Sequence, residues 1–260
     1  MRVIDTVSDE GMTKRQAVLW AVIVVVALAM RLAQLGAAPL TAAEARQATA
    51  AWQAIAGQGM PVRDYSPLLL TANSVLFWIS GASDVLARFW PALFGAGLVL
   101  IPLLFRRRLG WTGALASGIY LAFSPTALVA SRQVAGTAIA AAGAVASVGG
   151  LFRFLETENR RWLMFGAVSL SVAITSGAAV YGLLLPLALA WILASRPELG
   201  GRTIGGRHAV SLLKDSASQF LLVLTLSALA LSTGLGWNPS GLGGVGALLA
   251  DWFERFQAAD

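Results

Sequence analysis

Residues 85–108 read VLARFWPALFGAGLVLIPLLFRRR, an apolar block that ends on three consecutive arginines. A helix needs roughly 20 apolar residues to cross the hydrocarbon core of a bilayer, so this block is long enough to span it. Lys and Arg collect in the cytoplasmic loops of membrane proteins. The stretch therefore predicts a transmembrane helix whose end, at Arg106, Arg107 and Arg108, lies on the cytoplasmic side.

Comparable apolar blocks recur along the 260-residue chain, in which 57% of the residues are hydrophobic and 12% are charged. Soluble domains carry about 25% charged residues. The expected fold class is an all-α polytopic membrane protein with about seven transmembrane helices and additional interfacial amphipathic helices. The predicted spans are residues 17–36, 85–105, 112–130, 134–155, 162–176, 178–194 and 217–236. The first block lacks a clear cleavage motif, which favours a retained anchor that follows a cytoplasmic tail, residues 1–16.

An eighth apolar stretch, residues 67–82, is short and contains Thr71, Asn73 and Ser80. If it lies in the membrane interface, most of the 19 basic residues fall in cytoplasmic connectors, such as the polar segment 195–216. If it spanned the membrane, the three arginines at 106–108 would face outward. Loop charge thus favours seven spans, a cytoplasmic N-terminus, an extracytoplasmic C-terminus and a large outer loop, residues 37–84.

Two further segments are predicted to lie along the outer interface. The first, residues 42–56, gathers Ala45, Ala48, Trp52 and Ile55 on one side. The second, residues 241–256 within the terminal segment 237–260, repeats apolar residues at steps of three and four, with Asp251, Glu254 and Arg255 elsewhere. Its apolar positions are Leu242, Val245, Leu249, Trp252 and Phe256. The alternative is that this last helix begins a soluble tail.

The fourth predicted span is rich in small residues, because Gly136, Ala140 and Ala144 recur every four positions with Gly143 and Ser147 beside them. Small residues allow helices to approach closely in lipid. This pattern favours a tightly packed central helix over a ligand groove.

The composition excludes several classes of function. The chain has no cysteine and a single histidine, so disulfides, thiolate metal sites, iron–sulfur clusters and bis-histidine haem are ruled out. We expect no metal and no cofactor. The net charge of +6 comes largely from short loops between apolar blocks, which indicates contact with membrane lipids rather than with nucleic acid.

The outer loop is where chemistry is expected. It contains Glu44, Arg46, Arg63 and Asp64, and Arg88 and Arg132 are predicted near the same membrane face. Carboxylates and arginines together are able to bind a phosphate and activate a hydroxyl group. The alternative, which the residues alone favour, is a solvated loop whose arginines contact lipid headgroups.

An ordered set of segments resembles the GT-C membrane glycosyltransferases, and in particular the protein-mannosyltransferase and aminoarabinose-transferase branch near the archaeal N-glycosylation-associated membrane proteins. The set includes Pro39-Leu40-Thr41-Ala42-Ala43-Glu44, Tyr65-Ser66-Pro67-Leu68, Ala87-Arg88-Phe89-Trp90-Pro91, Ser124-Pro125 and Ser131-Arg132. Its first segment is Arg31-Leu32 and it ends near Trp237-Asn238-Pro239, so the set covers nearly the whole chain. The chain resembles the front portion of such an enzyme, because relatives usually continue with further spans.

The resemblance implies where a catalytic site would lie. Family members typically carry an Asp-Glu pair in the first outer helix, and Ala43-Glu44 stands there in this chain. A second acidic residue of the family matches Thr137, and a common lysine matches Ser176. Three positions expected to be charged are therefore neutral, and Ala43 is unable to accept a proton.

The expected function is that of a catalytically degenerate GT-C-like protein, an accessory or scaffold subunit of a larger membrane complex. The alternative is an active transferase that moves a sugar from a polyprenyl-phosphate donor to an extracytoplasmic acceptor, with Glu44 and Asp64 as catalytic residues. In both cases Arg88 and Arg132 are the expected ligands of a lipid phosphate. A transporter is disfavoured, because the predicted spans are nearly free of charge.

Topology is the first testable prediction. A reporter inserted in the Arg106–Arg108 loop should be found in the cytoplasm, and one inserted at Gly59 should be found outside, because only seven spans keep most basic residues inside. Finding both reporters on the same side would contradict the seven-span topology and would require residues 67–82 to cross the membrane.

Overall fold

The structure is a computed structural model that describes residues 12–58, 65–178, 180–182, 206–236, 239 and 241–257. For residues 206–211, 213, 214 and 255–257 only the backbone is described. Within these ranges every regular element is a helix. The predictions for Arg63 and Asp64, and those for most of the span at 178–194, lie outside the described residues.

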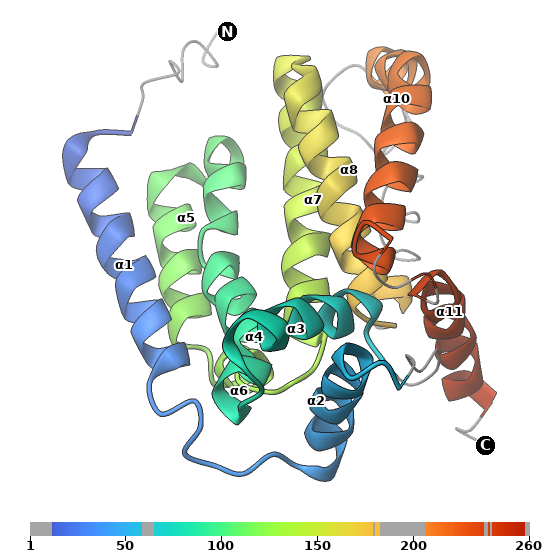
Figure 1. Ribbon diagram of the computed structural model, residues 1–260. Coiled ribbons are helices and arrows are strands. Elements are labelled where there is room, and N and C mark those ends of the chain that lie inside the picture. The colour runs from blue at the N-terminus through green and yellow to red at the C-terminus, as the bar shows by residue number, and fades with distance from the viewer. Residues whose placement is uncertain are drawn as a thin grey trace, which may run out of the picture.

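Long helices run side by side and form a bundle (Figure 1). They are α1 (Lys14–Leu32), α4 (Asp84–Leu98) with its extension η1 (Ile101–Phe105), α5 (Arg106–Phe123), α7 (Thr137–Thr157), α8 (Arg160–Ser176) and α10 (Gly206–Thr233). Among the described residues, four stretches are long and apolar enough to cross a membrane, namely Lys14–Leu32, Asp84–Phe123, Thr137–Thr157 and Asp215–Thr233. The architecture fits an α-helical membrane protein.

The stretch Asp84–Phe123 has two arms. Its helices are interrupted at Gly110, where φ is 70° and ψ is 173°, a backbone conformation that glycine adopts without strain. Figure 1 shows α4 and α5 as neighbouring arms of the bundle. The second arm ends at Phe123, because Ser124 caps and Pro125 opens a short new helix, α6 (Pro125–Ser131). The predicted span 112–130 was therefore wrong at its end.

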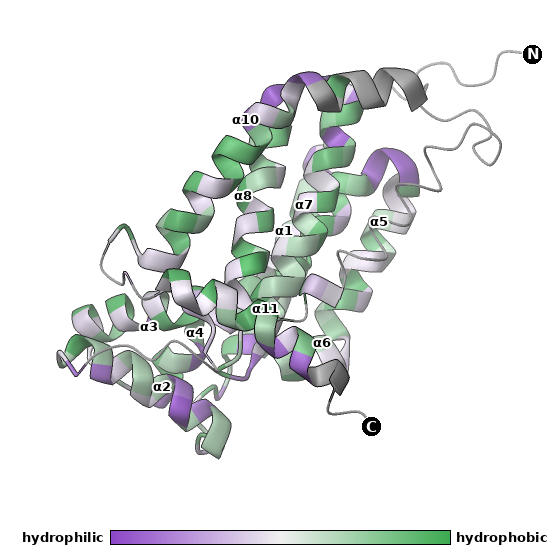
Figure 2. Cartoon of the chain, turned by 90° about the vertical axis from the view of Figure 1, so that its right-hand side faces the viewer, coloured by the Kyte–Doolittle hydropathy of each residue, from purple (hydrophilic) through white to green (hydrophobic). Residues whose placement is uncertain are grey.

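The shorter helices gather at one end of the bundle (Figures 1 and 2). They are α2 (Ala42–Ile55), α3 (Pro67–Ser80), α6 and α11 (Gly241–Gln257). Helix α3 crosses beneath the bundle instead of continuing it. Its 14 residues extend about 21 Å, short of the roughly 30 Å hydrocarbon core. This placement agrees with an interfacial position for residues 67–82.

Basic residues gather at the opposite end. In Figure 1 the start of α1, the start of α5 and the connection from α7 to α8 all lie there. These segments carry Lys14, Arg15, Arg106, Arg107, Arg108, Arg160 and Arg161. The Nε of Arg108 lies 3.1 Å from Oε1 of Glu156, and its guanidinium stacks on Phe152. The two ends of the bundle thus differ in charge, as the loop pattern predicted.

Helices α7 and α8 pack backbone to backbone along the predicted small-residue face. A Cβ atom added to Gly143 would lie 2.6 Å from the carbonyl oxygen of Ser169, and one added to Gly136 would collide with the carbonyl oxygen of Ser176. The prediction of a tightly packed central helix is confirmed. Because α8 covers this face, it is not a docking surface for another protein.

Helices α10 and α2 differ from the sequence-based prediction. Helix α10 begins at Gly206, so the last part of the predicted connector 195–216 is helical. Helix α2 buries Glu44, Gln47 and Ala51, whereas Trp52 on its predicted apolar side is exposed. The ion pair described below draws Glu44 inward and sets this rotation.

Helix α11 is also rotated relative to the prediction. Leu242, Leu249 and Phe253 form its exposed apolar stripe, and Leu248 is buried. Trp252 packs on Tyr181, with the ring centroids 6.5 Å apart. The helix thus uses one side to cover the rest of the protein and keeps an apolar stripe outside.

The close approach of α7 and α8 is testable at Gly143. We expect Gly143→Val to lower the free energy of unfolding by about 1–3 kcal/mol, because the new side chain would push the α8 backbone away. The measurement is thermal unfolding of the purified protein in detergent. The control is Gly97→Val in α4, where an added Cβ meets nothing within 4 Å. Equal effects at the two positions would contradict the close packing.

Candidate functional site

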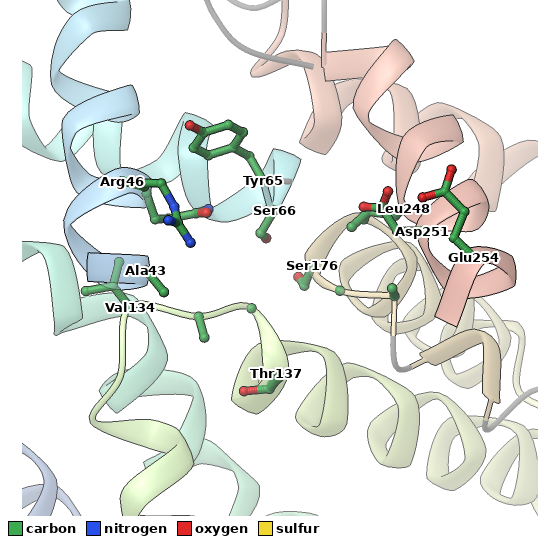
Figure 3. Close-up of a pocket in the computed structure, with 15 residues that line it drawn as sticks. Ala43, Arg46, Tyr65, Ser66, Val134, Thr137, Ser176, Leu248, Asp251 and Glu254 are labelled. Atoms are coloured by element: carbon green, nitrogen blue, oxygen red, sulfur yellow. The ribbon is translucent and has the colours of Figure 1, made fainter. Parts of the chain in front are cut away.

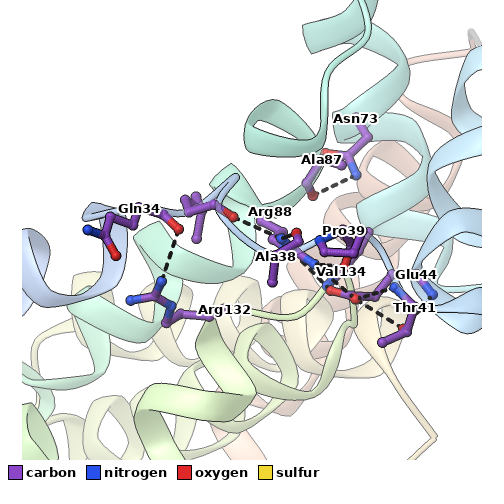
Figure 4. Close-up of polar contacts among 11 residues, drawn as sticks. Gln34, Ala38, Pro39, Thr41, Glu44, Asn73, Ala87, Arg88, Arg132 and Val134 are labelled. Carbon is purple, nitrogen blue, oxygen red and sulfur yellow. Dashed lines mark hydrogen bonds and ion pairs between the residues drawn. The ribbon is translucent and has the colours of Figure 1, made fainter.

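A buried ion pair between Glu44 of α2 and Arg88 of α4 lies at the interfacial end of the bundle (Figure 4). The Arg88 Nε donates to Glu44 Oε1 at 3.0 Å, and Nη2 donates to Oε2 at 3.1 Å. Both side chains are at most 7% exposed. The carboxylate also accepts from the backbone N–H of Thr41 at 2.9 Å and of Val134 at 3.0 Å.

Every N–H of the Arg88 guanidinium has a partner. Besides the two bonds to Glu44, Nη1 donates to the carbonyl oxygens of Leu35 and Ala38, both at 2.8 Å, and Nη2 donates to that of Pro39 at 3.2 Å. An arginine has five such donors. The ion pair therefore joins four segments: the connector after α1, the start of α2, α4 and the connector before α7.

Glu44 remains ionised in this environment. Burial raises the pKa of its carboxyl group, but hydrogen bonds from Arg88, Thr41 and Val134 outweigh that effect and hold the pKa at about 2. A carboxylate with such a low pKa and fully used oxygens is a poor proton acceptor. In this structure Glu44 caps the start of α2 and joins it to α4 through Arg88. Asp64, the other candidate, lies outside the described residues.

The two arginines expected to bind a lipid phosphate hold the backbone after α1. Arg132 donates to the carbonyl oxygens of Met30 at 2.9 Å and Gln34 at 3.2 Å. Arg88 donates to the carbonyls that follow, as described above. A phosphate at Arg88 would have to displace one of these partners, whereas Arg132 is only half-buried. Phosphate binding at Arg88 and Arg132 stays a prediction, and the geometry disfavours it at Arg88.

A cavity of about 760 Å³ lies beside this ion pair (Figure 3). Helix α2 contributes Ala43, Arg46 and Gln47, the start of α7 contributes Thr137, and the end of α8 contributes Ser176. Further walls come from Tyr65, Ser66, Val134, Ala135, Gly136, Gly177, Ala178, Leu248, Asp251 and Glu254. Among the described residues, no three His, Cys, Asp or Glu side chains gather to hold a metal ion.

Ala43, Thr137 and Ser176 line this one cavity although they lie far apart in the chain. These are the three positions at which the resemblance implies charged residues. Adjacent helix residues point about 100° apart, so Glu44 turns to Arg88 while Ala43 faces the cavity. The wall at which the resemblance implies an acid therefore holds a methyl group.

The sequence did not reveal which charges reach the cavity. Arg46 lies on one side, and Asp251 and Glu254 of α11 lie on the other (Figure 3). The sequence predicted only that Asp251 and Glu254 lie away from the apolar positions of this helix. Gln47 was also missed: it is 8% exposed, and its Nε2 has no hydrogen-bond partner.

Comparisons with models of protein families, with curated proteins and with solved structures found no match to this chain. The functional argument therefore depends on the geometry of the cavity and on the residues that line it.

The ion pair is testable through Glu44→Gln. Removing one partner leaves Arg88 buried without a counter-charge, so we expect the free energy of unfolding to fall by about 3–5 kcal/mol. The matched control is Glu156→Gln at the more exposed pair with Arg108, where we expect a loss of about 0–1 kcal/mol. Thermal or denaturant unfolding in detergent measures both changes.

The pH dependence identifies the charge as the cause. Because the pKa of Glu44 is lowered from 4.5 to about 2, its stabilisation is complete above pH 4.5 and is lost as the pH falls toward about 2. The difference in stability between the unmodified protein and Glu44→Gln should shrink over this range. A difference that stays constant down to pH 2 would contradict the ionised pair.

Proposed function

We propose that this protein is a catalytically degenerate GT-C-like membrane protein that serves as an accessory or scaffold subunit of a larger membrane complex. The observation that carries the proposal is the cavity wall formed by Ala43, Thr137 and Ser176. A general base is typically worth about 100- to 10,000-fold in rate. A cavity with a methyl group at this wall favours binding over transfer.

The adjacent Glu44 supports the same proposal. Its carboxylate is oriented away from the cavity wall by the bonds to Arg88, Thr41 and Val134. Moving it into the cavity would leave the Arg88 charge buried without a partner, which is strongly unfavourable. Glu44 is therefore unable to replace an acid at position 43.

The outer surfaces of the bundle are suited to contacts within a membrane. Helix α1 exposes Val18, Leu19, Val22 and Val25, and α10 exposes Leu221, Leu222, Leu226 and Leu229. We propose that these faces contact membrane lipids and other membrane-protein subunits. The basic end of the bundle supports a cytoplasmic N-terminus, and the paired arms α4 and α5 support seven spans over the whole chain.

One observation favours the alternative of an active transferase that uses a polyprenyl-phosphate-linked sugar. Asp251 and Glu254 line the same cavity as Ala43, so carboxylates are present on the opposite wall. Asp64 lies in the loop just before Tyr65, which also lines the cavity. In the alternative function, one of these acids replaces the missing base.

A transfer assay decides between the two. The purified protein and its Ala43→Asp variant would be incubated with polyprenyl-phosphate-linked sugars and cell-envelope acceptors. We expect background transfer by the unmodified protein, because no base faces an acceptor from α2. Robust transfer that is abolished by Asp64→Asn or Asp251→Asn, but not by the exposed control Asp215→Asn, would overturn the degenerate function and establish the enzyme.

A further inference from the structure

The cavity has a donor wall and an acceptor wall. On α2, the guanidinium of Arg46 and the amide of Gln47 are hydrogen-bond donors. On α11, the carboxylates of Asp251 and Glu254 are acceptors. Figure 3 shows Arg46 and the two carboxylates on opposite sides of the space, with Ser66 and Ser176 between them. Opposite charges at opposite ends select a ligand that carries both charges.

Gln47 gives an independent indication of a ligand. This residue lines the cavity, and only 8% of its surface is exposed. Its Nε2 has no hydrogen-bond acceptor in the protein. A buried donor without a partner is destabilising, and native proteins rarely retain one. Because Nε2 itself is closed to solvent, an oxygen of a bound ligand beside α2 would supply the missing acceptor once the Gln47 amide rotates toward the cavity.

The charges decide among ligand classes. A purely anionic headgroup would be attracted by Arg46 but repelled by Asp251 and Glu254, and a purely cationic group would meet the opposite conflict. A ligand with a phosphodiester beside α2 and a primary ammonium beside α11 satisfies both walls. Helices α2 and α11, which line the cavity, lie at the interfacial end of the bundle (Figure 1), where headgroups of the outer leaflet would be located.

We propose that this cavity binds a phosphoethanolamine group, with the phosphodiester on Arg46 and Gln47 and the ammonium on Asp251 and Glu254. The inference rests on the cavity of the proposed function being a binding cavity, but it does not depend on whether the protein transfers sugar. The group would come from a phosphatidylethanolamine lipid or from a soluble phosphoethanolamine ester.

The test uses the purified full chain in detergent and measures affinities by calorimetry. The probes are dihexanoyl phosphatidylethanolamine, dihexanoyl phosphatidylglycerol, which lacks the ammonium, and glycerophosphoethanolamine, which lacks the acyl chains. We expect the ethanolamine lipid to bind about tenfold more tightly than the glycerol lipid, because charge-assisted hydrogen bonds of the ammonium are lost in the latter. Binding of glycerophosphoethanolamine as well would identify the soluble source as sufficient.

Substitutions in α11 and α2 test the role of each wall in binding. The double change Asp251→Asn and Glu254→Gln should abolish the preference for ethanolamine over glycerol, and Arg46→Gln should weaken both lipids by a similar factor. The controls are Arg15→Gln and Asp215→Asn, exposed residues that do not line the cavity and should leave the affinities unchanged. Thermal unfolding without lipid checks that each variant folds.

Two results would overturn the inference. One is equal affinity for the two lipids in the unmodified protein. The other is a preference that survives the double change in α11. Neither result bears on the transfer assay, so failure of this inference is distinguishable from failure of the proposed function.

Discussion

The buried Glu44–Arg88 pair is the interaction on which the rest of the interfacial end depends. The desolvation of a buried guanidinium is best offset when each donor is satisfied and a counter-charge is present, and Arg88 meets both conditions. Meeting them draws the connector after α1, the start of α2 and Val134 onto α4. It also sets the rotation of α2, so that Ala43 and Gln47 face the cavity while Glu44 faces inward.

The wall of the cavity formed by α7 and α8 is positioned by the close packing of small, uncharged residues. Membrane helices associate through close contact of small residues, and Gly136 and Gly143 let α7 approach the backbone of α8. This approach brings Thr137 at the start of α7 next to Ser176 at the end of α8. The Glu44–Arg88 ion pair therefore positions one wall of the cavity, and the glycine contacts between α7 and α8 position the other. Both walls have neutral residues at the positions where the resemblance implies charges.

Helix α11 forms the remaining wall of the cavity and adds two carboxylates to it. Trp252 packs on Tyr181, and the hydroxyl of Tyr181 donates to the carbonyl oxygen of Val245. These contacts turn Leu248, Asp251 and Glu254 toward the cavity and leave Leu242, Leu249 and Phe253 outside. The result is a space with a donor wall and an acceptor wall. The proposal that the cavity binds a zwitterionic group is based on these two walls.

The sequence by itself determined the features that arise within one segment. Apolar length predicted helices long enough to cross a membrane, and the described residues contain four such candidates. The arginines at 106–108 identified the basic end, the small-residue repeat identified the packing of α7, and the 100° step between helix residues separated Ala43 from Glu44. Tertiary structure alone decided that Glu44 pairs with Arg88, that α2 buries the face opposite its exposed Trp52, and that Asp251 and Glu254 reach the cavity. These outcomes depend on contacts between segments far apart in the chain. Local periodicity carries no information about such contacts, because many partner segments satisfy the same helical pattern equally well.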